Sequence, residues 1–131
     1  MKKFIIMAAI GAATVGCQTA VPQSIADTQR PPSKAVRATI VKAARDFVLD
    51  PYSIRDAEIS NVVLFNPQAR IEAVCVKANA KNGYGGYSGK QATSVSLRGG
   101  MILGATTNDL RCLDPRLGYH PFKELQNLKN L

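Results

Sequence analysis

The clearest pattern of apolar and polar positions lies at residues 33–49, where apolar side chains recur at helical spacing. Ser33 fits an N-cap, and Asp50-Pro51 ends the helix because proline cannot continue it. The expected core face of the helix is formed by Val36, Ile40, Val41, Ala44, Phe47 and Val48. The pattern therefore predicts an amphipathic helix that packs on a larger apolar surface.

After Pro51 the pattern changes to that of strands. The predicted strands are residues 54–65, 69–78, 91–98 and 101–107. Gly99-Gly100 is a two-residue hairpin signal between the last two strands. Residues 121–128 predict a short C-terminal helix, with Pro121 acceptable in its first turn.

These elements predict an α+β fold for a single domain at residues 33–131. The N-terminal amphipathic helix is expected to pack on a three- to four-stranded antiparallel meander, followed by the short C-terminal helix. Since residues 69–78 carry apolar side chains on both faces, we expect that strand to lie centrally.

The N-terminal residues 1–16 have the pattern of a secretory signal. Lys2 and Lys3 precede an apolar run at residues 4–10, and small residues follow it. The run is too short for a spanning helix, which needs about 20 apolar residues. We therefore expect an exported protein.

The exit from this signal resembles the site at which bacteria attach lipid to a cysteine. Gly16 and Cys17 fit that lipobox pattern, whereas Thr14 stands where leucine is usual. The alternative is ordinary cleavage after Ala13, which would release a soluble periplasmic or secreted protein. Lipidation at Cys17 predicts a lipoprotein anchored in the membrane, and Gln18 favours the outer membrane, facing the periplasm.

Residues 18–32 are polar, proline-punctuated and without periodicity. Together with the lipidated cysteine, residues 17–32 predict a flexible tether without fixed structure. Such a stretch could reach about 50 Å when extended.

The formal net charge of +8 falls to +6 once Lys2 and Lys3 are removed. A basic chain can bind nucleic acid, anionic lipid or an anionic glycan. Export argues against nucleic acid, and the basic residues form no run of like charges. An anionic cell-wall glycan or an envelope protein stays open as a partner.

The three cysteines are an odd number for an exported protein. Lipidation of Cys17 leaves Cys75 and Cys112, which can form a disulfide in an oxidising compartment. The alternative is two buried free thiols. The sequence contains no C-x-x-C motif and a single histidine, so we expect no metal site and no cofactor.

The glycine-rich segment at residues 79–90 is the most distinctive part of the chain. It fails the phosphate-loop template, because Tyr84 and Gln91 stand where that motif needs glycine and serine or threonine. A binding role would use its basic, amide and aromatic side chains, namely Lys81, Asn82, Tyr84, Tyr87 and Lys90. The alternative is a long hairpin turn whose tyrosines pack back on the sheet.

This segment also carries a resemblance. Asn79-Ala80-Lys81-Asn82 followed by Tyr84-Gly85-Gly86-Tyr87-x-Gly89 resembles a motif of small uncharacterised bacterial envelope proteins and lipoproteins. The Asp50-Pro51-Tyr52-Ser53 element is similar to one that precedes the motif in those proteins. The resemblance covers about residues 35–98, implies a shared α+β domain, and implies no catalytic residues.

Catalysis has little support in the sequence. A hydrolase needs a nucleophile, a base and an orienting acid, and the single histidine, His120, lies near the tail. Asp56 and Glu58 share one strand face, so weak glycan hydrolysis by two carboxylates is the remaining enzymatic alternative. We expect a non-enzymatic envelope lipoprotein that presents a small interaction domain.

Overall fold

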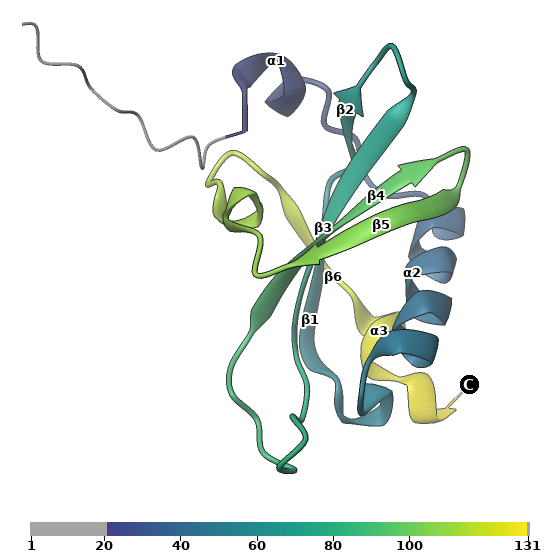
Figure 1. Ribbon diagram of the computed structural model, residues 1–131, viewed down its shortest axis with the longest axis vertical. Coiled ribbons are helices and arrows are strands. Elements are labelled where there is room, and N and C mark those ends of the chain that lie inside the picture. The colour runs from purple at the N-terminus through teal and green to yellow at the C-terminus, as the bar shows by residue number, and fades with distance from the viewer. Residues whose placement is uncertain (1–20, 131) are drawn as a thin grey trace, which may run out of the picture.

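A six-stranded antiparallel sheet forms the centre of the structure, a computed structural model that describes residues 21–130 (Figure 1). The strands are β1 (Arg55–Ser60), β2 (Val63–Asn66), β3 (Ile71–Asn79), β4 (Gln91–Arg98), β5 (Met101–Thr107) and β6 (Tyr119–Pro121). Their order is β5-β4-β3-β1-β6, and β2 also pairs with β3. The predicted α+β class is confirmed, and β3 is central as expected.

The meander that the sequence predicted is only part of this sheet. β3, β4 and β5 follow one another as neighbours, whereas β1, β2 and β6 extend the sheet on the other side of β3. The predicted strand at 54–65 is divided in two. Between the two parts, Val62 does not pair with β3. It exchanges backbone hydrogen bonds with Arg30 instead, at 2.8 and 3.0 Å.

Helix α2 (Lys34–Phe47) begins where the sequence placed it, because the Ser33 side chain accepts the backbone N–H of Val36 at 3.1 Å. Ile40 and Val41 are buried on its inner face. Phe47, which we expected in the core, is 87% exposed at the end of the helix. That expectation was wrong, and the exposed ring becomes part of the groove described below.

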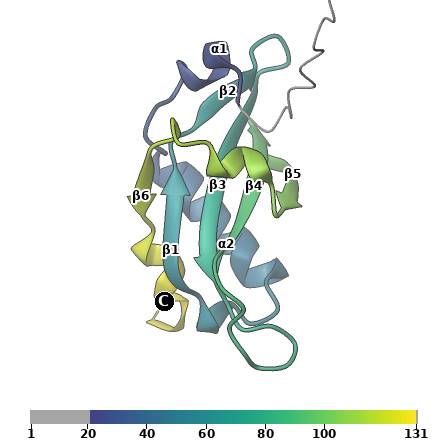
Figure 2. The same cartoon turned by 90° about the vertical axis from the view of Figure 1, so that its left-hand side faces the viewer.

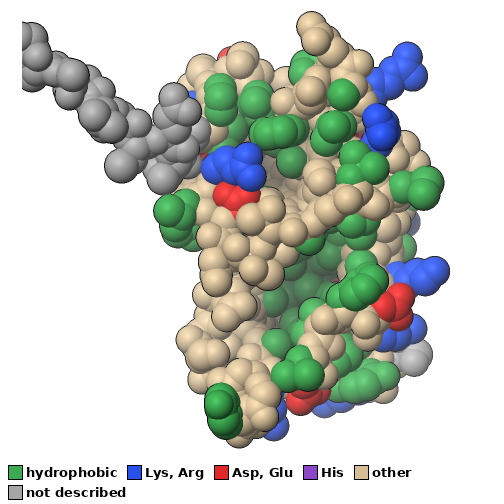
Figure 3. Space-filling model, viewed as in Figure 1, with side chains coloured by type: hydrophobic (Ala, Val, Ile, Leu, Met, Phe, Trp, Pro, Cys, Tyr) green, Lys and Arg blue, Asp and Glu red, His purple; other side chains and the backbone are tan. Residues whose placement is uncertain are grey.

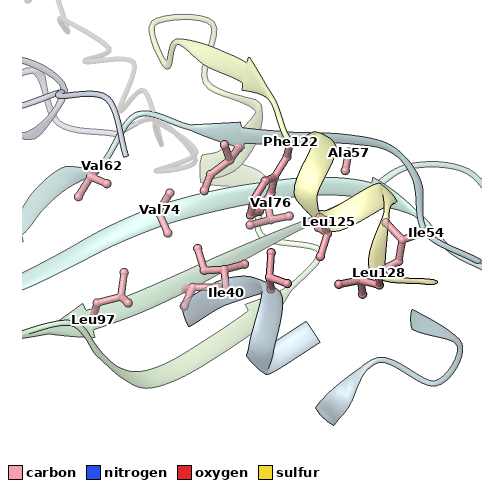
Figure 4. Packing of buried hydrophobic residues seen from close by; sticks show 13 residues of the cluster. Ile40, Ile54, Ala57, Val62, Val74, Val76, Leu97, Phe122, Leu125 and Leu128 are labelled. Atoms are coloured by element: carbon pink, nitrogen blue, oxygen red, sulfur yellow. The ribbon is translucent and has the colours of Figure 1, made fainter. Parts of the chain in front are cut away.

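The larger core lies between the sheet and the two helices α2 and α3 (Lys123–Gln126). Its buried members are Ile40, Val41, Ile54, Ala57, Ile59, Val62, Val74, Val76, Val95, Leu97, Phe122, Leu125 and Leu128. Figure 4 shows Ile40 of α2, Val76 of β3 and Leu125 of α3 gathered in this cluster. Alternate residues of β3 point into it, which is the periodicity of a strand with two packed faces.

A second, smaller core lies on the opposite face of the sheet. The short helices α1 (Gln23–Ala26) and η2 (Leu110–Leu113) cover that face, and Figure 2 shows η2 crossing it while α2 lies behind the sheet. Its buried members are Val21, Ala26, Val63, Cys75, Cys112 and Leu117. A disulfide joins Cys75 to Cys112, with Cα atoms 5.6 Å apart, as one of the two sequence alternatives predicted.

The N-terminal segment corrects the predicted tether. Residues 21–32 pack on the domain, because Asp114 accepts the backbone N–H of Val21 at 3.0 Å and Thr28 accepts that of Leu64 at 2.7 Å. Residues 17–20 of the predicted tether, the signal at 1–16 and the lipidation site Cys17 lie outside the described residues. Among residues 21–130, no helix is both long enough and apolar enough to cross a membrane.

The C-terminal segment also differs from its prediction. Residues 121–128 were expected to form one short helix, but Pro121 ends β6 and the helix α3 begins after Phe122. A final turn, η3 (Leu128–Asn130), follows. Because Phe122 is fully buried and its N–H bonds to the Ala57 carbonyl at 2.8 Å, strand pairing prevails over the local helical pattern.

Candidate functional site

An apolar groove of about 740 Å³ opens between α2 and the outer strands of the sheet. Its floor is the face of β3, β4 and β5 that α2 shields in part, and Figure 3 shows it as a hollow lined by hydrophobic side chains. The lining residues of the helix wall are Ile40, Ala43, Ala44, Phe47, Val48 and Leu49. Those of β5 are Ile102, Leu103, Gly104, Ala105 and Thr107.

The groove exists because small side chains stand where a core would need large ones. β5 is the edge strand, and all its residues except Ile102 are exposed. Ala105, which pairs with Val95 on the groove face of the sheet, places little volume between β5 and the helix. The floor therefore stays open instead of being filled as a packed interior is.

Large apolar side chains surround this opening. Phe47 is 87% exposed, Leu49 75% and Leu103 47%, and all three line the groove. A contiguous exposed apolar surface on a small domain marks an interaction or ligand site more often than isolated exposed side chains do. The groove is therefore the first candidate for the functional site.

The polarity of the groove changes along its length. Lys81, Asn82, Ser88 and Gln91 line the end next to the glycine-rich loop. Among the residues that the structure describes, Lys81 is the only charged one in the lining. The opposite end, towards Ile102, is apolar. The groove thus has an apolar interior and one basic, hydrogen-bonding end.

The loop at residues 79–90 ends in a defined turn at its tip. Asn82 Oδ1 accepts the backbone N–H groups of Tyr84 and Gly86 at 2.9 and 3.2 Å, and the Asn82 N–H bonds to the Gly86 carbonyl. Gly85 has a φ of 77°, a conformation that glycine adopts without strain. This turn holds the backbone of Lys81 and Asn82 beside the groove.

The structure separates the residues that the sequence proposed as one binding loop. Lys81 and Asn82 line the groove, whereas Tyr84 is fully exposed at the tip. Tyr87 donates its hydroxyl to the Ser53 carbonyl at 2.7 Å and lies under the Arg55 guanidinium, 3.5 Å from the ring centroid. Lys90 pairs with Glu58 at 2.8 Å. These contacts engage Tyr87 and Lys90 with the β1 side of the domain.

The two parts of the motif that carried the resemblance meet in space. Ser53, at the end of η1 (Pro51–Ser53), accepts the backbone N–H of Lys81 through its hydroxyl at 2.8 Å. Its carbonyl accepts the Tyr87 hydroxyl. The Asp-Pro-x-Ser element therefore supports the root of the glycine-rich loop and, through it, the basic end of the groove.

A smaller hollow of about 320 Å³ lies on the opposite face of the sheet, between η2, α1 and the outer strands. Asp109 lies in its wall, where it accepts hydrogen bonds from Arg111 at 2.7 Å and from Ser94 at 2.6 Å. The hydrogen bonds from Arg111 lower the pKa of Asp109 from 3.8 to about 2, against a smaller opposing effect of burial.

A second pair repeats this arrangement. Asp114 accepts the backbone N–H of Arg116 at 2.9 Å and its guanidinium at 2.7 Å, and these bonds lower the pKa of Asp114. In both pairs the sequence is Asp-x-Arg, and the aspartate closes a turn on its own arginine. We did not infer these buried carboxylates from the sequence, although the repeated spacing was visible in it.

The residues considered for catalysis have structural partners. Glu58 is paired with Lys90, and Asp56 has a φ of 53° at an irregularity in the β1–β3 pairing, next to Arg55. His120 lies 2.6 Å from Asn61 through Nε2. Among residues 21–130, no three His, Cys, Asp or Glu side chains are grouped to hold a metal ion.

Comparisons of the chain with protein-family models, with curated proteins and with solved structures found no match. The resemblance of residues 35–98 to small bacterial envelope proteins therefore stays a prediction.

Proposed function

We propose that the chain is a non-enzymatic lipoprotein of the bacterial cell envelope, anchored through Cys17, whose domain presents the groove beside α2 as its interaction surface. The observation that carries the interaction role is the exposure of Phe47, Leu49 and Leu103 around one apolar opening. Burying such side chains in a complex is favourable, at roughly 25 cal/mol for each Å² removed from water.

Export is supported by two independent features. The signal pattern at residues 1–16 is one. The other is the Cys75–Cys112 disulfide, since disulfides persist in oxidising compartments and are rare in the cytosol. The outer membrane, facing the periplasm, is the proposed location, because Gln18 follows the lipidation site.

The fixed N-terminal segment changes the distance at which such an anchor would hold the domain. Val21 is already packed in the smaller core, so only residues 18–20 separate it from Cys17. Four residue steps extend at most about 14 Å. We therefore propose a domain held close to the membrane, with the groove on the sheet face opposite Val21.

Mass spectrometry of the mature N-terminus tests the anchoring. The expected species begins at Cys17 and carries acyl groups, whereas an unmodified chain that begins at Thr14 would refute the lipoprotein proposal. Replacing Cys17 with serine should also release the domain from isolated membranes.

Site-specific photo-crosslinking in cells tests the interaction surface. A photo-reactive residue in place of Leu103, within the groove, should give a defined adduct. The control places the same residue at Gln68, an exposed turn position that lines neither hollow. Equal labelling from both positions, or none from Leu103, would contradict the assignment of the groove.

The second candidate is a soluble exported protein that binds an anionic cell-wall glycan. The full exposure of Tyr84 favours it, because an aromatic ring at a loop tip can stack on a sugar. Pelleting of the domain with isolated sacculi, weakened by salt and abolished by Tyr84→Ala, would support this candidate over the groove. Release of soluble fragments would indicate the weak glycan hydrolase instead.

A further inference from the structure

We propose that the groove beside α2 binds a long-chain fatty acid, with the acyl chain along the apolar floor and the carboxylate at Lys81. This inference deepens the proposed function and rests on it, because it names the ligand class of the same surface. It follows from the size of the groove, the distribution of its polar groups and the partners of its one charged residue.

The size of the groove fits one small ligand. Its volume of about 740 Å³ lies within the range of roughly 300–1,000 Å³ found for ligand sites. The floor at Val76, Val95 and Ala105 is apolar and continuous across three strands. An extended hydrocarbon chain needs such an apolar lining along its whole length, whereas a globular protein partner needs a broader and flatter contact surface.

The polar groups are gathered at one end, which favours an amphiphile over a purely apolar ligand. Lys81 supplies a positive charge there, and Asn82 and Gln91 supply amide groups beside it. No acidic residue of the described part of the chain, residues 21–130, lines the groove. The ligand that complements this end therefore carries one negative charge at the end of an apolar chain.

Lys81 is free to serve this role within the described part of the chain. The ion pairs among residues 21–130 involve other basic residues. The nearest aromatic ring, that of Tyr87, has its centroid 5.9 Å from Lys81 Nζ, near the limit for a cation–π contact. One ammonium group balances the one negative charge of a carboxylate better than the nearly double charge of a phosphate monoester.

The backbone of Lys81 is fixed by hydrogen bonds on both sides of the loop base. Its N–H bonds to the Ser53 hydroxyl, and its bridge to Tyr87 closes the base of the loop. The contacts that connect the Asp-Pro-x-Ser element to the glycine-rich loop thus fix the backbone of Lys81 at the polar end of the apolar groove, within reach of a ligand carboxylate.

The test measures binding of fatty acids to residues 17–131 carrying Cys17→Ser, which removes the protein's own lipid and keeps every described residue. Octanoate, dodecanoate and hexadecanoate are compared by calorimetry at pH 8. Affinity should rise about two- to fourfold for each added methylene until the groove is filled, fourfold being the value for full burial. Dodecyltrimethylammonium, which has the same chain length and the opposite charge, should bind at least tenfold more weakly than dodecanoate.

Two matched pairs of variants locate the ligand. Lys81→Gln should weaken dodecanoate binding about three- to tenfold, as expected for a half-exposed ion pair. Lys42→Gln removes the same charge from an exposed α2 position outside the groove and should have no effect. Ala105→Trp fills the groove from an exposed strand position, whereas Thr106→Trp makes the same change on the opposite face of β5. Only Ala105→Trp should abolish binding, and circular dichroism should show all four variants folded.

The outcomes separate this inference from the proposed function. Equal binding of dodecanoate and dodecyltrimethylammonium, unchanged by Lys81→Gln but lost in Ala105→Trp, would overturn the fatty acid and leave the groove as an apolar interaction site. No binding of either probe, together with no crosslinking from position 103, would overturn both. Dimerisation of the ligand-free chain that Ala105→Trp abolishes would show that a second copy occupies the groove, and would also overturn the fatty acid.

Discussion

Removing the disulfide should cost the domain a large share of its stability. Cys75 on β3 and Cys112 on η2 are 37 positions apart, so the disulfide closes a long loop. The crosslink lowers the conformational entropy of the unfolded chain, which stabilises the folded domain by about 4 kcal/mol. Domains of this size have unfolding free energies of about 5–15 kcal/mol. The double variant Cys75→Ala/Cys112→Ala should therefore be only marginally folded.

The loss of stability caused by removing the crosslink can be distinguished from damage to the native packing. Cys112 is fully buried and Cys75 is 7% exposed, so alanine leaves a small apolar gap and no unpaired polar group. The segment that contains Cys112 keeps other attachments, since the Asp109 N–H bonds to the Ala92 carbonyl at 3.1 Å and Ser94 bonds to the Asp109 carboxylate. The native structure should thus survive, with the loss arising mainly in the unfolded chain.

The assay is urea unfolding of the oxidised domain, the reduced domain and the double variant, followed by circular dichroism. The midpoint should fall in both modified forms, and the dependence on urea should steepen slightly, because an unfolded chain without a crosslink exposes more surface. The melting temperature should fall by roughly 15–30 °C, from about 4–8 °C per kcal/mol in domains near this size. Coincident midpoints for the oxidised and reduced forms would refute the reasoning.

Three further changes test other contacts. Ser33→Ala should lower the free energy of unfolding by about 1 kcal/mol in urea titrations, because the Val36 N–H loses its cap. Since Asp109 has its pKa lowered to about 2, its contribution is present above about pH 4 and is lost as the pH falls through 2. That contribution is about 1–2 kcal/mol after allowance for the exposure of Arg111, and Asp109→Asn should remove it from the acid unfolding curve. Asp114→Ala should speed hydrogen exchange at residues 21–30 but not in β3, because the Val21 N–H loses the side-chain oxygen that accepts it.

The sequence predicted the elements whose ends are set by local chemistry. β4 and β5 have the predicted bounds, because Gly99 and Gly100 adopt the positive φ angles of 57° and 79° that a two-residue hairpin requires. Helix α2 begins at its predicted cap and ends two residues before the predicted end. In each case the deciding residues are neighbours in the sequence, so a pattern could find them.

The elements that differed depend on partners far along the chain. The run at 54–65 is divided because the backbone of Arg30 takes the hydrogen bonds of Val62. Residues 21–32 have the composition of a tether, yet Asp114, 93 positions from Val21, accepts its N–H. Composition describes what a segment can bury alone and does not reveal a carboxylate that a distant turn supplies.

The site was found only in part for a related reason. The glycine-rich loop drew attention to Lys81 and Asn82, but it also suggested Tyr87 and Lys90, whose contacts with Ser53 and Glu58 engage them elsewhere. The groove itself has no sequence motif. Its residues are the apolar types that also form cores, so periodicity could not distinguish the two uses.

Phe47 and Ile40 illustrate why that distinction needs the fold. They are seven residues apart, nearly two helical turns, and so lie on the same face of α2. Ile40 meets the filled centre of the sheet and is 4% exposed, whereas Phe47 extends past it, where β5 presents the small side chain of Ala105, and is 87% exposed. The same helical face therefore serves as core at one end and as binding wall at the other. What decides between them is the side-chain volume on an edge strand more than fifty residues away, and a bulky residue at Ala105 should convert the wall back into core.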